Sequence, residues 1–523
     1  MHSIASVGSA GGAAQYFAKD DYYLGEGPGE LSEWGGKGAA ELGLDGEVKR
    51  ADFENLLNSI LPDGTLVNGA ENKSHGLDLT FSLPKSASVL ALVAGDSRIL
   101  EAHRAAVTAT MVWAEQKFAE ARDYSRVRKG EPIKTGNLVY ALFEHDTSRK
   151  LDPQSHIHVV VAAITQTAQG QWKALWNGEL WRNNSVIGSA YHAFSRAEME
   201  KLGYETRLTG KHGQYEISGV SKEVIQAFSR RREEIVQKSA ELGISTPQGQ
   251  DRVVVNTRDA KLNVDDKEAL RADWHRRAAQ LGFDCKPLIE AAIARSVTHY
   301  EQTLGSPERV QSILGELRDT LGQYFRASDP LATNGMKRIG LTPSELRTEI
   351  AVASAVRIHG QREAAFPINQ IAKTALDLGL KDVTADKVDA RISRLIRNDL
   401  VVPGVTDRID GLISHVTTHE HIAQERQLLT EIDKGRGAQL PALNPAMVTQ
   451  RLQDAAAERP LNGEQLGAAT LALTTRDRIS VIQGVAGAGK TTLIEAVSKV
   501  AREEGKEVLG LAFANKMVGM LRD

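Results

Sequence analysis

Residues 137–165 read NLVYALFEHDTSRKLDPQSHIHVVVAAIT, two apolar stretches separated by a polar segment. The first stretch runs to His145 and the second runs from His156 to Thr165, and both are rich in the β-branched and aromatic residues typical of strands. The segment between them contains Ser, Asp and Pro, which favour turns. The pattern therefore predicts two strands joined by a loop.

This hairpin brings three histidines together. Side chains at positions i and i+2 of a strand lie on one face, so His156 and His158 point the same way. Folding the hairpin back places His145 beside them. Three converging imidazoles predict a metal site with open positions for substrate. A closed structural zinc site is not expected, because it needs a fourth ligand and no cysteine lies near.

The composition describes a globular chain of two or three domains, with 523 residues, 41% of them hydrophobic, and a net charge of −3. This charge excludes a global positive field, so any contact with nucleic acid must come from local patches. The single cysteine, Cys285, excludes a disulfide framework and indicates a reducing compartment. The sequence shows neither an apolar run of transmembrane length nor a secretory signal, so we expect a cytoplasmic protein without membrane insertion.

The pattern of the chain changes near residue 250. Before it, strands such as Leu77 to Leu83 alternate with helical stretches such as 97–122 and 221–240, which indicates an α+β domain with an antiparallel sheet and helices on its face. Residues 262–460 are mostly helical in pattern, and 386–416 predict a helix and two short strands, a winged-helix-like element. The fold class that we expect is therefore α+β, followed by a mostly helical region and the start of a P-loop α/β domain.

Three tyrosines, Tyr16, Tyr22 and Tyr23, fall within eight residues near the N-terminus. Alone they would be ordinary core or interface residues. A phenol with a pKa near ~10 is a poor nucleophile unless its electrophile is activated, and a divalent metal on a phosphate supplies that activation. Beside a three-histidine site, the tyrosines indicate phosphoryl transfer to a tyrosine.

Asp78 lies in the apolar strand GLDLTFSL, where an unpaired carboxylate is costly. It is a candidate either to orient a metal-ligating histidine or to accept the phenolic proton. An outward-facing strand aspartate is the alternative.

Basic residues cluster in three segments. The clusters are Arg122, Arg126, Arg128, Lys129 and Lys134; Arg230, Arg231 and Arg232; and Arg271, Arg276 and Arg277. Each is a candidate for phosphate contacts, with Trp274 or another aromatic residue stacking on bases. Each is equally compatible with a solvated face, because acidic residues are interleaved.

The segment from Gly484 to Thr491, GVAGAGKT, matches the phosphate-binding loop G-x-x-x-x-G-K-[ST]. The preceding RISVIQ (478–483) predicts a strand, LIEAVSKVAREEG a helix, and KEVLGLAFAN a second strand. The loop backbone with Gly484, Gly487 and Gly489 is expected to hold phosphates, Lys490 to reach the β- and γ-phosphates, and Thr491 to bind Mg²⁺. The printed chain reaches Asp523 before any strand that could supply the acidic Mg²⁺ partner. We therefore expect the chain to end inside this domain, and ATP with Mg²⁺ to be used only where the domain is complete.

Residues 1–290 resemble conjugative relaxases of the TrwC/TraI type, which are HUH (histidine–hydrophobic–histidine) endonucleases. The resemblance rests on the blocks QYFAKDDYY, WGGKGAAELGL, GLDLTFSLPKS, NLVYALFEHDTSR, QSHIHVVVA and LGYETRLTGKHGQYEISGV. It implies site- and strand-specific nicking of single-stranded plasmid DNA at an origin of transfer, dependent on a divalent metal such as Mg²⁺ or Mn²⁺. It also implies a 5′-phosphotyrosyl intermediate and reverse rejoining.

The resemblance also implies roles for single residues. Tyr16 corresponds to the primary nucleophile, and Tyr22 or Tyr23 to the tyrosine of the second transfer. The metal triad corresponds to His145, His156 and His158, with Asp78 as the carboxylate beside it. Phe17 stands where some members have a tyrosine, which leaves Tyr22-Tyr23 as the one adjacent pair.

The remainder resembles the start of the RecD-like helicase that follows the relaxase in such proteins. In PLNGEQLGAATLAL, Gln465 corresponds to a glutamine that reads adenine, and GVAGAGKTT to the Walker A motif. We expect a relaxase domain at 1–290, a helical or winged-helix-like part of the helicase at 291–440 and an incomplete P-loop domain at 441–523. Unwinding in the 5′–3′ direction is then a property of a longer parent chain.

The resemblance further implies partners. These are relaxosome accessory DNA-binding proteins and a type IV coupling protein, with translocation to a recipient cell by type IV secretion. Nothing in the sequence indicates an obligate oligomer, so we expect a monomer.

Three alternatives stay open. Related tyrosine enzymes initiate rolling-circle replication or move single-strand transposons. The second alternative is a P-loop motor whose N-terminal region only binds DNA. The third is a protein passenger secreted with the DNA.

Overall fold

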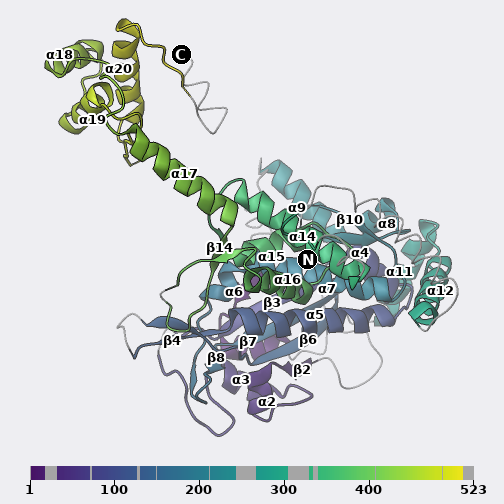
Figure 1. Ribbon diagram of the computed structural model, residues 1–523. Helices are drawn as coiled ribbons and strands as arrows, with labels where there is room; N and C mark the ends of the chain where they lie inside the picture. Colours follow the sequence, from purple (N-terminus) through teal and green to yellow (C-terminus); the bar gives the residue numbers. More distant parts are fainter. Residues whose placement is uncertain are drawn as a thin grey trace. The chain divides into compact units, whose positions relative to one another are not determined.

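The computed structural model describes residues 2–17, 32–70, 73–125, 130–148, 150–210, 212–242, 267–303, 329–333, 340–406, 408–485 and 487–510 (Figure 1). It divides into two compact units, Met1–Thr418 and His419–Asp523. The first unit contains an antiparallel sheet in the order β1-β3-β7-β6-β2. Its strands are β1 (His2–Ser6), β2 (Ser32–Gly35), β3 (Gly76–Ser82), β6 (Tyr140–Thr147) and β7 (Pro153–Ala162).

The two faces of this sheet carry different layers, because side chains alternate along each strand. On one face, β7 presents Ile157, Val159 and Val161 to a core that it shares with the long helices α5 (Arg98–Phe118) and α7 (Asn184–Lys201). On the other face, Phe143 and Val160 belong to a second core, which includes residues of helices α1 to α3. These helices are α1 (Ala10–Phe17), α2 (Lys37–Glu41) and α3 (Arg50–Leu57).

Shorter elements surround the sheet. The β-hairpins are β4–β5 (Glu120–Asp123 and Glu131–Lys134), β8–β9 (Ile164–Gln166 and Trp172–Ala174) and β10–β11 (Thr206–Leu208 and Tyr215–Ile217). The further helices are α4 (Lys85–Leu92), α6 (Gly178–Arg182), α8 (Lys222–Ala227), α9 (Arg230–Glu241), α11 (Lys267–Gln280) and α12 (Lys286–Thr303).

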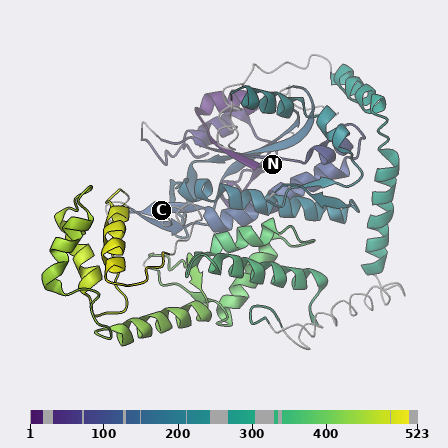
Figure 2. The ribbon, with the colours of Figure 1, turned by 90° about the horizontal axis from the view of Figure 1, so that it is seen from above.

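The first unit continues into a winged-helix module, which we define as residues 343–417. Its elements follow in the order α14 (Pro343–Gly360), β12 (Phe366–Pro367), α15 (Ile368–Asp377), α16 (Ala385–Arg397), β13 (Val402–Pro403) and β14 (His415–Thr417). The three short strands pair antiparallel in the order β12-β14-β13. Helix α14 begins with a capping box, in which Thr342 and Glu345 each accept from the other's backbone N–H. In Figures 1 and 2 the module lies beside α7, and the winged-helix-like element expected at 386–416 is observed as part of it.

The second unit consists of helices in its described part. They are α17 (His419–Gly435), α18 (Pro445–Ala455), α19 (Gly463–Thr474) and α20 (Lys490–Glu503). Helices α18, α19 and α20 share a small core, in which Val448, Leu473 and Val500 are buried. No helix in the described ranges combines the length and apolar character that crossing a lipid bilayer requires.

Three sequence expectations differ from the structure. The helix expected at 97–122 ends at Phe118, because the chain turns into β4 and pairs with β5. The helix expected at 221–240 is divided into α8 and α9. Residues 478–483, all described, form no strand, since a strand needs a partner for its backbone groups and none pairs with them among the described residues.

Candidate metal centre

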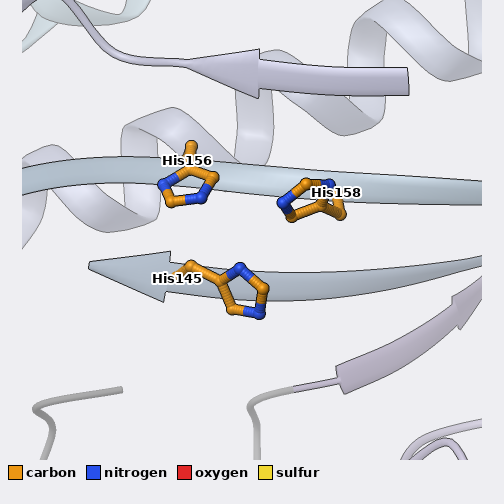
Figure 3. A group of neighbouring side chains, drawn as sticks. All are labelled: His145, His156 and His158. Atoms are coloured by element: carbon orange, nitrogen blue, oxygen red, sulfur yellow. The ribbon is translucent and has the colours of Figure 1, made fainter. Parts of the chain in front are cut away.

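The three predicted histidines lie close together on the paired strands β6 and β7. His145 lies directly opposite His156 in the strand register, and His158 lies opposite Phe143. Each imidazole offers one nitrogen to a group whose ligand atoms all lie within 4.8 Å of one another. The ring centroids are 4.9 to 5.2 Å apart, and the rings face a common point (Figure 3).

Hydrogen bonds decide which nitrogen of two of these rings faces the common point. His156 Nδ1 lies 2.9 Å from the carbonyl oxygen of Gln154, and His158 Nδ1 lies 2.9 Å from both carboxylate oxygens of Asp78. A carbonyl and a carboxylate only accept, so Nδ1 is the protonated nitrogen in both rings. Nε2 then carries the lone pair, which is the arrangement found in metal-ligating histidines.

Burial keeps His156 and His145 uncharged. It lowers the pKa of His156 from 6.5 to about 3, with a smaller contribution from the neighbouring His158. It also lowers the pKa of His145 well below its usual value, again with the other two imidazoles adding to the effect. Neutral imidazoles are the form that binds a metal, so His145 and His156 need release no proton near neutral pH.

Three neighbours hold His158, and only one was predicted. Asp78 lies on β3, which pairs with β7, and its carboxylate bonds the imidazole. Thr80, two residues further along the same face, places its hydroxyl 3.2 Å from the same nitrogen. Phe17 packs its ring against His158 at a centroid distance of 5.1 Å. Thr80 could have been predicted, because side chains two residues apart on a strand lie on the same face, as those of Asp78 and Thr80 do. The contact of Phe17 could not, because it depends on how α1 packs.

The predicted tyrosines are only partly described. Tyr16 lies on α1, next to Phe17, which places its backbone on the histidine face of the sheet, while its side chain lies outside the described residues. Tyr22 and Tyr23 also lie outside them.

The turn between β6 and β7 is held by residues of the basic clusters that are candidates for DNA contact. Asp152 is 1% exposed and accepts hydrogen bonds from the guanidinium of Arg230 at 2.8 Å and from that of Arg277 at 3.1 Å. The indole of Trp274 donates to the carbonyl of Leu151 at 2.9 Å. Trp274 is 1% exposed, so the expectation that it stacks on bases is wrong: its ring is core.

The other basic residues differ in what they contact. The guanidinium of Arg122, on β4, lies 3.6 Å from the ring centroid of Trp176, which follows β9, in a cation–π stack. Arg231 forms an ion pair with Glu234 at 2.8 Å. Arg126, Arg128 and Lys129 lie outside the described residues, as does the side chain of Arg232.

The glycine-rich loop of the second unit leads into α20 as expected. Gly487 and Gly489 have φ values of 81° and 73°, a left-handed conformation that favours glycine. Gln465 donates from its side-chain amide to the carbonyl of Ala488 at 2.9 Å, which places it against the loop. The ammonium of Lys490 donates to the carbonyls of Gly484 and Val485 at 2.6 and 2.8 Å. Thr491 follows at the exposed start of α20.

Two parts of the chain match known protein families. Residues 10–281 match the family described as TrwC relaxase, and residues 460–523 match the family described as AAA domain.

Two curated relatives, both called multifunctional conjugation protein TraI, come from Escherichia coli. One is 30% identical over 527 residues, which cover 97% of this chain and 26% of the relative. The other, from strain K12, is 38% identical over 313 residues, which cover 57% of this chain and 17% of the relative. The chain thus spans about a quarter or less of the length of these relatives.

A solved structure is also similar to the first unit. It is described as the conjugative relaxase TrwC in a copper-bound complex with oriT DNA. The similarity has a TM-score of 0.50 at 39% identity and covers 54% of this chain and 99% of that one.

Proposed function

Because the chain belongs to the TrwC relaxase family, we propose that it is a conjugative relaxase that nicks single-stranded DNA at an origin of transfer by transesterification to a tyrosine. The observation that carries this proposal is the histidine cluster. Three imidazoles with ligand atoms within 4.8 Å of one another, two of them with Nε2 available, sit on the sheet face that also carries α1 with Tyr16.

The donor set fits a divalent cation. Three nitrogen ligands leave coordination positions open, and a bound cation would neutralise the non-bridging oxygens of a phosphodiester and fix its orientation. The protein side chains supply the remaining functions. In the proposed reaction the phenolic oxygen of Tyr16 attacks phosphorus, the bond from phosphorus to the 3′ oxygen breaks, and the phenolic proton ends on the 3′ oxygen, which becomes a hydroxyl. One phosphodiester is exchanged for another, so the reverse reaction rejoins the strand.

Asp78 is proposed to orient His158 rather than to accept the phenolic proton. Both of its carboxylate oxygens lie 2.9 Å from His158 Nδ1, a geometry that fixes the tautomer and the orientation of the ring. Tyr22 or Tyr23 is the proposed acceptor of the second transfer.

For DNA contacts, Arg122 is the best-supported candidate in the described residues, because its stack on Trp176 presents a flat cationic surface next to an aromatic ring. Arg126, Arg128 and Lys129 follow it in the same segment. Arg230 and Arg231 are engaged in intramolecular ion pairs, which supports a role in shaping the site as well.

The second unit is proposed to be the beginning of a motor. Gln465, Gly484, Gly487, Gly489, Lys490 and Thr491 would bind ATP with Mg²⁺ in the complete domain. We propose the domain division 1–290, 291–440 and 441–523, with a cytoplasmic location. Relaxosome accessory proteins and a type IV coupling protein are the proposed partners.

The deciding experiment uses single-stranded oligonucleotides from the transfer-origin region of the host plasmid. Incubated with Mn²⁺ or Mg²⁺, the protein is expected to form a covalent adduct visible on a denaturing gel and located at Tyr16 by mass spectrometry. Chelator and the variants Tyr16→Phe and His156→Ala should abolish it. Tyr124→Phe, at a tyrosine that is 60% exposed, and His75→Ala, outside the histidine cluster, are matched controls that should keep it.

The outcomes separate the alternatives. An adduct that persists in Tyr16→Phe would refute the assignment of the nucleophile. Tight DNA binding without any adduct would favour a P-loop motor with a DNA-binding N-terminal region. Cleavage at a replication origin instead of a transfer origin would favour a rolling-circle initiator.

A further inference from the structure

The winged-helix module has the order of elements seen in DNA-reading modules. Helices α15 and α16 form a helix-turn-helix pair, and β13 and β14 form the wing. In helix-turn-helix proteins the second helix of the pair enters the major groove, and its neighbours contact the backbone. In this chain α16 would be that helix.

Helix α16 instead contacts the relaxase part of the same unit. The carboxylate of Asp389 accepts from the indole N–H of Trp113 at 2.6 Å and from the ammonium of Lys117 at 2.6 Å. Both donors lie on α5, and the ion pair is largely shielded, with Lys117 and Asp389 each 22% exposed.

The helix preceding it, α15, packs along α7. Asp377 accepts from the hydroxyl of Ser189 at 2.6 Å, and Asn369 donates to Asn183 at 3.1 Å. The turn between the two helices is equally engaged. A Cβ added to Gly379 would lie 2.6 Å from the side chain of Leu208 on β10, so the turn packs tightly against that hairpin.

The wing holds the β4–β5 hairpin. Arg408 donates to the carboxylate of Glu120 at 3.0 Å and to the carbonyl of Pro132 at 3.3 Å, and Asp410 accepts from the backbone N–H of Lys134 at 3.0 Å. Glu120 is 1% exposed. A carboxylate buried to this degree is costly without a cationic partner. Glu120 has two such partners, Arg408 from the wing and Lys134 from β5.

We propose that the winged-helix module is a docking module whose ligand is the relaxase domain of its own chain, and that it braces the β4–β5 hairpin instead of reading DNA. Its contact surface presents the carboxylates of Asp377, Asp389 and Asp410, which DNA phosphates would repel. Its buried apolar residues are also continuous with those of α5 and α7. The inference does not depend on the metal chemistry proposed above.

The test compares two double variants of the full chain in a Tyr16→Phe background. The first, Asp389→Ala with Arg408→Ala, removes module side chains that contact α5 and the hairpin. The second, Arg394→Ala with Arg397→Ala, removes two charges from exposed positions of the same helix and is the matched control. The measurements are hydrogen exchange by mass spectrometry and fluorescence anisotropy with labelled duplex and single-stranded DNA.

In the first variant, peptides of α5, α7 and β4–β5 should exchange at least about tenfold faster, with α1 to α3 unchanged. The second variant should keep wild-type exchange and bind duplex DNA within about twofold of the parent. Arg408→Met, which retains the aliphatic stem, should affect the β4–β5 peptides alone.

Two results would overturn the proposal. One is unchanged exchange in the first variant, and the other is a loss of about tenfold or more in duplex affinity in the second. Cleavage by the same variants with Tyr16 intact is followed in parallel. Loss of cleavage everywhere, wild type included, would count against the relaxase assignment and would leave the exchange data to decide on docking.

Discussion

At the scale of single residues, His158 shows how the metal site is built. Its ring is fixed by the Asp78 carboxylate, the Thr80 hydroxyl and the Phe17 ring, which come from two different elements. The strand alternation in GLDLTFSL places Asp78 and Thr80 on one face, so both could be found from the sequence. Phe17 could not, because its contact depends on the angle at which α1 crosses the sheet.

Replacing Asp78 by Asn should weaken metal binding about 10- to 100-fold, because the ring of His158 loses a charged acceptor that fixes its tautomer. Calorimetric titration with Mn²⁺ measures the effect. Asp63→Asn, at an exposed loop position, is the control and should leave the affinity unchanged. Equal affinities for wild type and Asp78→Asn would remove Asp78 from the site.

At the scale of elements, the β6–β7 hairpin depends on helices far along the chain. Helices α9 and α11 deliver Arg230 and Arg277 to the buried Asp152, four residues before His156. The sequence predicted this hairpin and its histidines correctly, because both depend on local pattern. It did not predict that Arg230 and Arg277 bind Asp152 or that Trp274 is core, because a basic cluster looks the same whether its partner is a phosphate or a distant carboxylate.

Asp152→Ala should therefore destabilise the first unit by about 3 kcal/mol, since it leaves two cationic groups without their buried partner. Denaturant unfolding followed by tryptophan fluorescence gives the change. Glu241→Ala breaks the exposed pair with Lys238 on α9 and should cost less than about 0.5 kcal/mol. Similar denaturant midpoints for the two variants would argue against a stabilising role of the contacts from Arg230 and Arg277 to Asp152.

At the scale of the whole molecule, buried histidines link stability to pH. Burial lowers the pKa of His2, His103 and His192 from 6.5 to about 3 each. Between these values the unfolded chain binds more protons than the folded one, so the free energy of unfolding falls as the pH is lowered through this window. All three lie in the first unit, so acid should unfold that unit specifically.

The expected result is a Tm that is flat above pH 7 and falls below pH 6.5, with each of these histidines contributing at most about 2 kcal/mol by pH 5. Differential scanning calorimetry across this range measures it. His103→Gln should reduce the slope, whereas His75→Gln, whose imidazole is only partly buried, is the comparison. A Tm independent of pH from 7 to 5 would contradict the assignment of these side chains as neutral.

A bound metal ion should also stabilise the first unit, because it binds the folded chain in preference to the unfolded one. At a free Mn²⁺ concentration about 100 times the Kd, the expected gain is about 2.7 kcal/mol. The gain should disappear in His156→Ala and in the presence of chelator. An equal rise of Tm in wild type and His156→Ala would place the bound ion elsewhere.

The order of the domains was the part of the architecture most accessible from the sequence. The relaxase blocks and the glycine-rich loop are local motifs, and the matches to the TrwC relaxase and AAA domain families, over residues 10–281 and 460–523, contain them. The prediction of a strand at 478–483 was wrong, because strand formation depends on a neighbouring strand that local composition does not specify. The docking of the winged-helix module was equally inaccessible, since it depends on pairs such as Trp113 and Asp389, 276 positions apart.

The two faces of strand β7 lie in different environments, a polar histidine cluster on one side and an apolar core on the other. His156 and His158 face the reacting side, and Ile157 and Val159 between and beside them face the helices that bear the module. Ile157 and Val159 are each adjacent in the sequence to a histidine of the cluster. A substitution that changes the side-chain volume at either position should therefore shift the backbone of that histidine. Libraries aimed at altering the preferred cation should therefore diversify Ile157 and Val159, two side chains that touch no ion.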